Sequence, residues 1–172
     1  SGQFFYPNGP AGTDAYEMAV QDENLLVVAG GHDDAWNNVY NSEGVSNYKN
    51  NLWSNYDYTQ IPAMDSAKDL LAAAIDPANP NHFFLGSWGW GLMEMNGGTV
   101  VNNWNVNNSS LRSKPDYHWV GIGDMKYDTL GNLWVVNSNV TTCLNVYKPD
   151  GTWQSFDFAG LIPTNETVGS LM

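Results

Sequence analysis

A plan of strands and turns recurs about every fifty residues along this chain of 172 residues. The turn glycines of the three units lie 53 and 54 residues apart, at Gly44, Gly97 and Gly151. The closing tryptophans lie 51 and 49 residues apart, at Trp53, Trp104 and Trp153. Each unit holds four short apolar runs joined by turns. Four antiparallel strands at this spacing are typical of a β-propeller blade.

The turns between the runs carry specific signals. Asn96-Gly97 and Asp150-Gly151 are strong hairpin signals, because a tight reversal that matches strand twist needs positive φ. Asp76 and Asp128 begin turns, where a carboxylate can accept bonds from nearby backbone N–H groups. The run 67–74 is rich in helix formers, but it occupies the first-strand position of its repeat. We therefore predict a strand there.

We predict an all-β fold, a β-propeller of about three four-stranded antiparallel blades with the start of a fourth at 160–172. The predicted blades are 14–56, 67–105 and 119–158. Long loops, where function is expected, interrupt them at 30–38, 54–66 and 105–118. Because closure generally takes 4 to 8 blades, we expect a piece of a longer protein whose remaining blades complete the ring.

Charge and composition exclude several classes of function. The chain has 18 acidic and 6 basic side chains, a formal net charge of -12, which disfavours nucleic acid as a partner. It has no apolar run near 18 residues, so we predict no membrane span. Hydrophobic residues make up 42%, too many for a disordered chain. The single cysteine, Cys143, cannot form an internal disulfide and is expected to be buried in a strand region.

Several stretches resemble a known repeat class. Residues 128–135 (DTLGNLWV) resemble the D-x-x-G-N-L-W-V core of two-component-regulator propeller repeats, and residues 160–168 resemble their G-L-P-x-N-x-V lead-in. Residues 6–10, 15–18 and 76–94 are similar to the propeller proteins of the Por (type IX) secretion system in Bacteroidetes. The resemblance spans nearly the whole chain.

This resemblance implies an extracytoplasmic location, in the periplasm or at the cell surface, and a role in docking or sensing. It offers no catalytic motif, so we expect no enzyme, cofactor or metal. The leading hypothesis is a binding module of a type IX secretion-associated surface protein that takes a protein or glycan ligand. The alternatives are the periplasmic sensor region of a hybrid two-component histidine kinase and a carbohydrate-active propeller enzyme.

The binding surface is predicted from aromatic and acidic residues in the loops. The stretch 86–91 alternates tryptophan and glycine, and its indoles either flank an open groove or cover a blade edge. The stretch 32–34 offers oxygen atoms to Ca²⁺ but lacks the alternating acidic loop, so a solvated turn is favoured. The predicted binding residues are Trp88, Trp90, His32, Asp33, Asp34, Trp36 and Trp119.

Enzymatic chemistry has weak support in the sequence. Glycoside hydrolysis needs two opposed carboxylates. Asp124 and Glu94 are candidates, but nothing in the sequence pairs them. Two carboxylates that converge in the channel with shifted pKa values would favour the enzyme alternative. His82, at the start of a strand, is expected to have a structural role.

Overall fold

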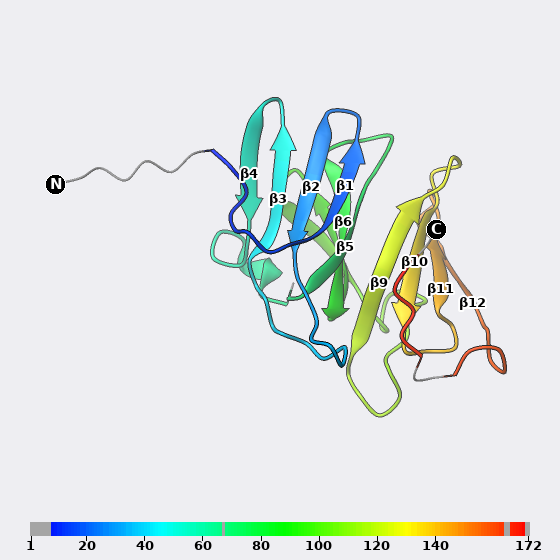
Figure 1. Cartoon of the computed structure of the whole chain (residues 1–172). Coiled ribbons are helices and arrows are strands. Elements are labelled where there is room, and N and C mark those ends of the chain that lie inside the picture. The colour runs from blue at the N-terminus through cyan, green and yellow to red at the C-terminus, as the bar shows by residue number, and fades with distance from the viewer. Residues whose placement is uncertain (1–7, 67, 164–165, 171–172) are drawn as a thin grey trace.

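The computed structural model describes residues 8–66, 68–163 and 166–170. These residues form twelve strands and one turn of 3-10 helix, η1 (Pro62–Met64), arranged as an open arc (Figure 1). The first blade contains β1 (Ala15–Gln21), β2 (Asn24–Ala29), β3 (Gly44–Lys49) and β4 (Leu52–Tyr56). The second contains β5 (Leu70–Ile75), β6 (His82–Gly89), β7 (Gly91–Asn96) and β8 (Thr99–Trp104). The third contains β9 (Val120–Tyr127), β10 (Leu133–Ser138), β11 (Leu144–Tyr147) and β12 (Trp153–Phe156).

Each blade is an antiparallel meander in which sequential strands pair. The second and third blades also share backbone pairing, because β6 runs past the end of β5 and pairs with β9 at Trp88–Gly121 and Gly89–Val120. The predicted all-β propeller fold is confirmed. The strand predicted at 67–74 is confirmed over 70–74 as part of β5; residues 68 and 69 precede the strand, and residue 67 lies outside the described residues. Its residues favour a helix by intrinsic propensity, but burial between two blades decides the conformation.

Two apolar layers separate the three blades. Leu26, Val28 and Phe83 belong to the layer between the first and second blades. Phe84, Ile122 and Val135 belong to the layer between the second and third blades. All six residues of β5 are therefore buried, whereas β1 leaves alternate side chains exposed. Each large side chain buried in these layers contributes about 1.5–3 kcal/mol.

The hairpin signals are confirmed. Gly97 (φ 55°) lies in the turn between β7 and β8, and Gly151 (φ 82°) in the turn between β11 and β12. Asp76 Oδ1 accepts the N–H of Ala78 at 2.8 Å, and Asp128 Oδ1 accepts the N–H of Leu130 at 2.9 Å. In each blade, a short turn joins the first strand to the second and another joins the third strand to the fourth. These turns lie on the same side of the arc, which we call the hairpin end.

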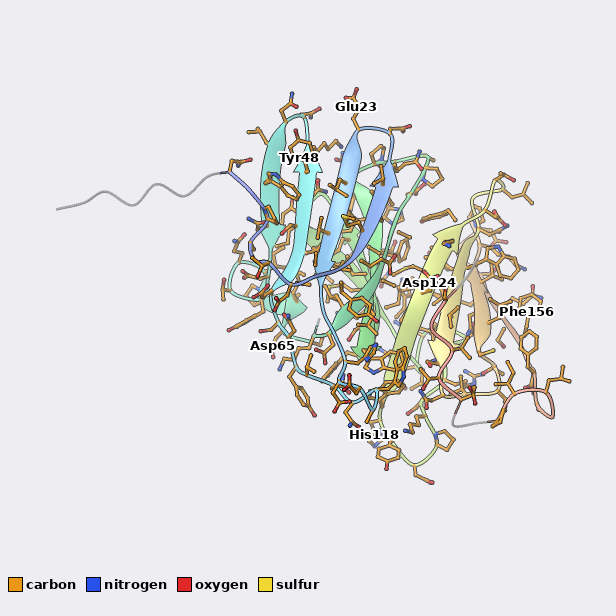
Figure 2. The ribbon with its side chains drawn as sticks, viewed as in Figure 1. Glu23, Tyr48, Asp65, His118, Asp124 and Phe156 are labelled. Carbon is orange, nitrogen blue, oxygen red and sulfur yellow. The ribbon has the colours of Figure 1, made fainter. Side chains whose placement is uncertain are left out.

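The opposite end carries the long connections, at residues 30–43, 57–69 and 105–119, and we call it the long-loop end. Figure 1 shows the loop after β2 and the loop before β9 together at the bottom of the view. In Figure 2, His118 and Asp65 mark this end, and Glu23 and Tyr48 mark the hairpin end. None of the described residues belongs to a helix that is long and apolar enough to span a membrane.

The last described residues run back along the third blade. Asn139 donates its N–H to Glu166 O at 3.0 Å, and Val168 donates to Ser138 Oγ at 2.9 Å. Residues 160–163 and 166–170 contain no strand, and the rest of the predicted fourth-blade start lies outside the described residues, as do Tyr6 and Pro7. Cys143 is buried as predicted, and its burial raises the pKa of the thiol.

Candidate functional site

Four of the predicted binding residues meet at the long-loop end. The imidazole of His32 stacks on the indole of Trp36, with ring centroids 3.8 Å apart. Trp36 lies 5.6 Å from Trp88, and Trp88 meets Trp119 edge-on at 4.8 Å. These rings come from loops and strands of all three blades. The structure thus builds one aromatic cluster from residues that are up to 87 positions apart (119 − 32).

The buried carboxylate of Asp69, just before β5, holds the first of the long loops in place. Its Oδ2 accepts the N–H of Tyr40 at 3.0 Å, and its Oδ1 accepts the N–H of Asn41 at 2.8 Å. Asn38 Nδ2 donates to Asp69 Oδ2 at 2.9 Å and also to the carbonyl oxygen of Trp88. A fully buried carboxylate needs such donors, because an unpaired charge there would be costly. We call residues 30–43 the anchored loop.

The anchored loop carries two large aromatic residues in the left-handed backbone region. Trp36 has φ 63° and Tyr40 has φ 60°, conformations that bulky residues rarely adopt. The bonds to Asp69 offset this local cost at Tyr40. At Trp36 the carbonyl oxygen accepts the indole N–H of Trp88 at 2.9 Å. Gly30 lets the loop pass over β5, since a Cβ there would lie 1.9 Å from Leu70 O.

Asp33 and Asp34 have different environments in this loop. Asp33 Oδ1 accepts the N–H groups of Ala35 and Asn37, at 2.9 and 2.8 Å. The side chain and backbone of Asn37 lower the pKa of Asp33, so it stays charged. Asp34 is exposed. The favoured solvated turn is what the structure shows at 32–34, and the described residues contain no group of three or more His, Cys, Asp or Glu side chains placed to hold a metal ion.

The two tryptophans of the 86–91 stretch differ in burial. Trp88 is fully buried, with its indole N–H bonded to the anchored loop, so it cannot present a ring to a ligand in this conformation. Trp90 is 40% exposed and meets Tyr40 edge-on at 6.2 Å. Trp119 donates its indole N–H to Asn38 Oδ1 at 2.9 Å. Trp88 and Trp119 therefore support the anchored loop, and Trp36 and Trp90 reach the surface.

A cavity of about 390 Å³ lies beside the anchored loop, between the inner strands β1, β5 and β9. Trp36 and Tyr16 line it together with Glu17 and Asp124. Burial and the neighbouring carboxylate of Asp124 raise the pKa of Glu17 to about 7. Figure 2 shows Asp124 on the inner strand β9, facing the middle of the arc. Two carboxylates thus line one cavity in the channel, but Asp124 shares it with Glu17 and not with Glu94, and Lys126 lines it as well.

Glu94 belongs to a second polar cluster, at the hairpin end. His82 Nδ1 lies 2.8 Å from Asp76 Oδ2, and His82 Nε2 lies 2.8 Å from Glu94 Oε1. Hydrogen bonds to the two carboxylates, the one to Glu94 first, raise the pKa of His82. Burial alone would raise the pKa of Glu94, but donors from His82, Asn102 and Trp104 lower it. The imidazole therefore joins three segments of the second blade, which is the structural role expected for His82.

Sequence reasoning missed Glu17 and Asp69. Strand alternation places Glu17 on the inward side of β1, so its position in the strand could have predicted a carboxylate that faces the channel. Asp69 gave no signal, because its partners are 28 to 31 positions away.

Comparison with known proteins places this architecture among bacterial propellers. No protein-family model and no curated protein sequence matches the chain significantly. Among solved structures, PorZ, an essential surface component of the type-IX secretion system of Porphyromonas gingivalis, superposes with a TM-score of 0.80 at 24% identity. A protein of unknown function from Bacteroides thetaiotaomicron superposes with a TM-score of 0.50 at 13% identity, over 83% of this chain and 33% of its own length.

The match to PorZ covers 98% of this chain and 22% of PorZ, so the chain spans about a fifth of that protein. The resemblance seen in the sequence is confirmed at the level of the fold.

Proposed function

We propose that this chain is a non-enzymatic, extracytoplasmic propeller module that docks a protein or glycan ligand in a type IX secretion-associated surface protein. The observation that carries the proposal is the anchored loop. Fully buried Asp69 and Trp88 fix its backbone, and the loop holds Trp36 and Tyr40 at the surface. Rigid aromatic side chains that are already positioned lower the entropic cost of binding.

Two further observations support this role. The fold is that of a region of PorZ, which is a surface component of a secretion system. The exposed aromatic residues also gather at one end: Tyr16, Trp36, Tyr40, Tyr58, Trp90 and Tyr117 all lie at the long-loop end. Exposed tryptophan and tyrosine are enriched in the energetically important parts of interfaces.

The test is made in the bacterium that encodes the chain, with Tyr40→Ala and Trp90→Ala introduced together in the full-length gene. We expect a normal amount of the protein at the surface and at least a fivefold fall in the export of type IX cargo. Tyr117→Ala is the matched control, because Tyr117 is also exposed at this end but its ring already contacts the Lys114 ammonium, whereas Tyr40 and Trp90 contact each other. Normal export from the double variant would contradict the proposal, and a lost signalling response with normal export would favour the sensor alternative.

One observation favours a second candidate, a carbohydrate-active enzyme. Glu17, with a pKa of about 7, shares the channel cavity with Asp124, and acid–base hydrolysis of a glycoside uses such a pair. The chain would be assayed on a panel of chromogenic glycosides beside Glu17→Gln and Asp124→Asn. Turnover that both substitutions abolish would support the enzyme. Equal rates in wild type and variants would exclude it for this cavity.

A further inference from the structure

We infer that the ligand of the long-loop end is a positively charged segment of a partner protein, whose lysine or arginine side chains lie over the aromatic rim. The aromatic rim consists of Trp36, Tyr40 and Trp90. This inference rests on the proposed docking function and names the chemistry of the partner.

The rim offers ring surface to a cation. Tyr40 is 65% exposed, Trp36 41% and Trp90 40%, and the Tyr40 and Trp90 rings lie 6.2 Å apart. An ammonium or guanidinium group within about 6 Å of an aromatic centroid is attracted by the negative face of the ring. Lys114 already makes such a contact with Tyr117, 5.3 Å from the ring centroid, on the neighbouring loop. The rings of the aromatic rim have no such cation from the described residues.

Charge around the rim selects the same class of partner. No lysine or arginine occurs before Lys49, so the anchored loop and the first two strands carry only acidic charge. Within the anchored loop, Asp33, Asp34 and Glu43 are exposed. A further acidic residue, Asp57, lies close to the end of the anchored loop in space. A Cβ on Gly44, the residue after this loop, would lie 3.1 Å from Asp57 Cα. The nearest basic residue along the chain, Lys49, lies at the hairpin end, and the next one, Lys68, directly precedes Asp69.

An anionic partner fits this surface poorly. The exposed carboxylates of the anchored loop would repel it, and the single arginine, Arg112, lies on another loop. A neutral apolar partner would leave the carboxylates without a counter-charge. A basic segment satisfies both the rings and the acidic side chains.

The experiment measures fluorescence anisotropy of a labelled (Lys-Gly)4 peptide with the whole chain at 150 mM NaCl, with (Glu-Gly)4 as the comparison peptide. We expect binding of the lysine peptide only. Tyr40→Ala with Trp90→Ala should weaken it at least tenfold, and Tyr117→Ala should leave it unchanged. Because Tyr40, Trp90 and Tyr117 are exposed, we expect these variants to fold, and circular dichroism checks that they do.

A second pair of variants separates local from overall charge. Asp34→Asn and Glu23→Gln remove the same charge, but Asp34 lies in the anchored loop and Glu23 lies at the hairpin end (Figure 2). We expect Asp34→Asn to weaken binding two- to threefold and Glu23→Gln to have no effect. Equal effects of the two, no loss in the aromatic double variant, or no binding of the lysine peptide would overturn the inference. Loss of export in the double variant without peptide binding would leave the docking function standing and remove only the basic partner.

Discussion

The two ends of the blades are held by different kinds of contact. At the hairpin end, turn carboxylates accept hydrogen bonds from residues two to six positions away, as Asp128 does from Leu130, Asn132 and Trp134. The hairpin end also has bonds between blades, such as Asn24 Nδ2 to Pro80 O, but at the long-loop end bonds between blades hold the anchored loop itself. Asn38 and Trp119 are 81 positions apart, and Trp36 and Trp88 are 52 apart.

This difference separates the end of the blades that repeats the same turns from the end that carries the candidate binding site. Short turns are fixed by local hydrogen bonds, so every blade can form them alone. The anchored loop needs Asp69 and Trp88 from the second blade and Trp119 from the third. The binding surface is therefore a property of the assembled arc and not of any one repeat.

The largest effect is expected from the two tryptophans of the 86–91 stretch. Trp88→Ala should lower the free energy of unfolding by about 3–5 kcal/mol, because it empties a fully buried site and removes the bond to Trp36. Trp90→Ala should lower it by less than about 1 kcal/mol, because Trp90 is partly exposed. Urea unfolding measures both. Similar losses would mean that both rings are structural.

Asp69→Ala should cost about 3 kcal/mol, because it leaves the donors of Asn38, Tyr40 and Asn41 without an acceptor in a buried site. Hydrogen exchange should become faster at these amides while the hairpin-end amides stay protected. Asp128→Ala is the control at the hairpin end, where solvent can replace the lost acceptor. If the two substitutions cost the same, the ends do not differ as described.

His82→Gln tests the polar cluster of the hairpin end. The pKa of His82 is raised above 6.5, so its contribution is complete below that pH and is lost as pH rises through the raised value. The pKa of Glu94 is lowered below 4.5, so its contribution is complete above that pH and is lost in acid.

The cluster should thus stabilise the chain most between pH 4.5 and 6.5. We expect the variant to lose about 1–2 kcal/mol at pH 5.5 and less at pH 9. Thermal unfolding at both pH values measures this, with His118→Gln as the control. A loss that is independent of pH would contradict the paired imidazolium.

The smallest effect is expected in the channel between the two ends. The pKa of Glu17 is raised to about 7, so its ionisation opposes folding as pH rises from 4.5 through 7. Glu17→Gln should therefore leave stability unchanged at pH 4 and increase it by about 1 kcal/mol at pH 8.5, after allowance for solvent screening. Glu23→Gln removes the same charge from an exposed turn. A gain of equal size in that variant would assign the effect to net charge alone.

The sequence predicted what depends on neighbours along the chain. The hairpins at Asn96-Gly97 and Asp150-Gly151 follow from turn chemistry, and β5 follows from its place in the repeat. The burial of Trp88 did not follow, because the loop that covers it comes from another blade. The choice between groove and blade edge for Trp88 and Trp90 thus required the three-dimensional contacts.

The pairing of Glu17 with Asp124 was missed for a similar reason. The two residues lie on inner strands of different blades, 107 positions apart (124 − 17), and only the curvature of the arc brings them to one cavity. The cluster around His82 was easier to predict. Glu94 pairs with Phe84 on the neighbouring strand, and Phe84 is two residues after His82. Cross-strand register would have predicted it.

The bond between Asn38 and Trp119 has a consequence for synthesis on the ribosome. At about 5–20 residues per second, the 81 positions between them take about 4 to 16 seconds to translate. During that interval Trp36 and Tyr40 have emerged, but the indole that completes the support of their loop has not. A chaperone that shields exposed aromatic residues would have this interval in which to act, and completion of the third blade would end it.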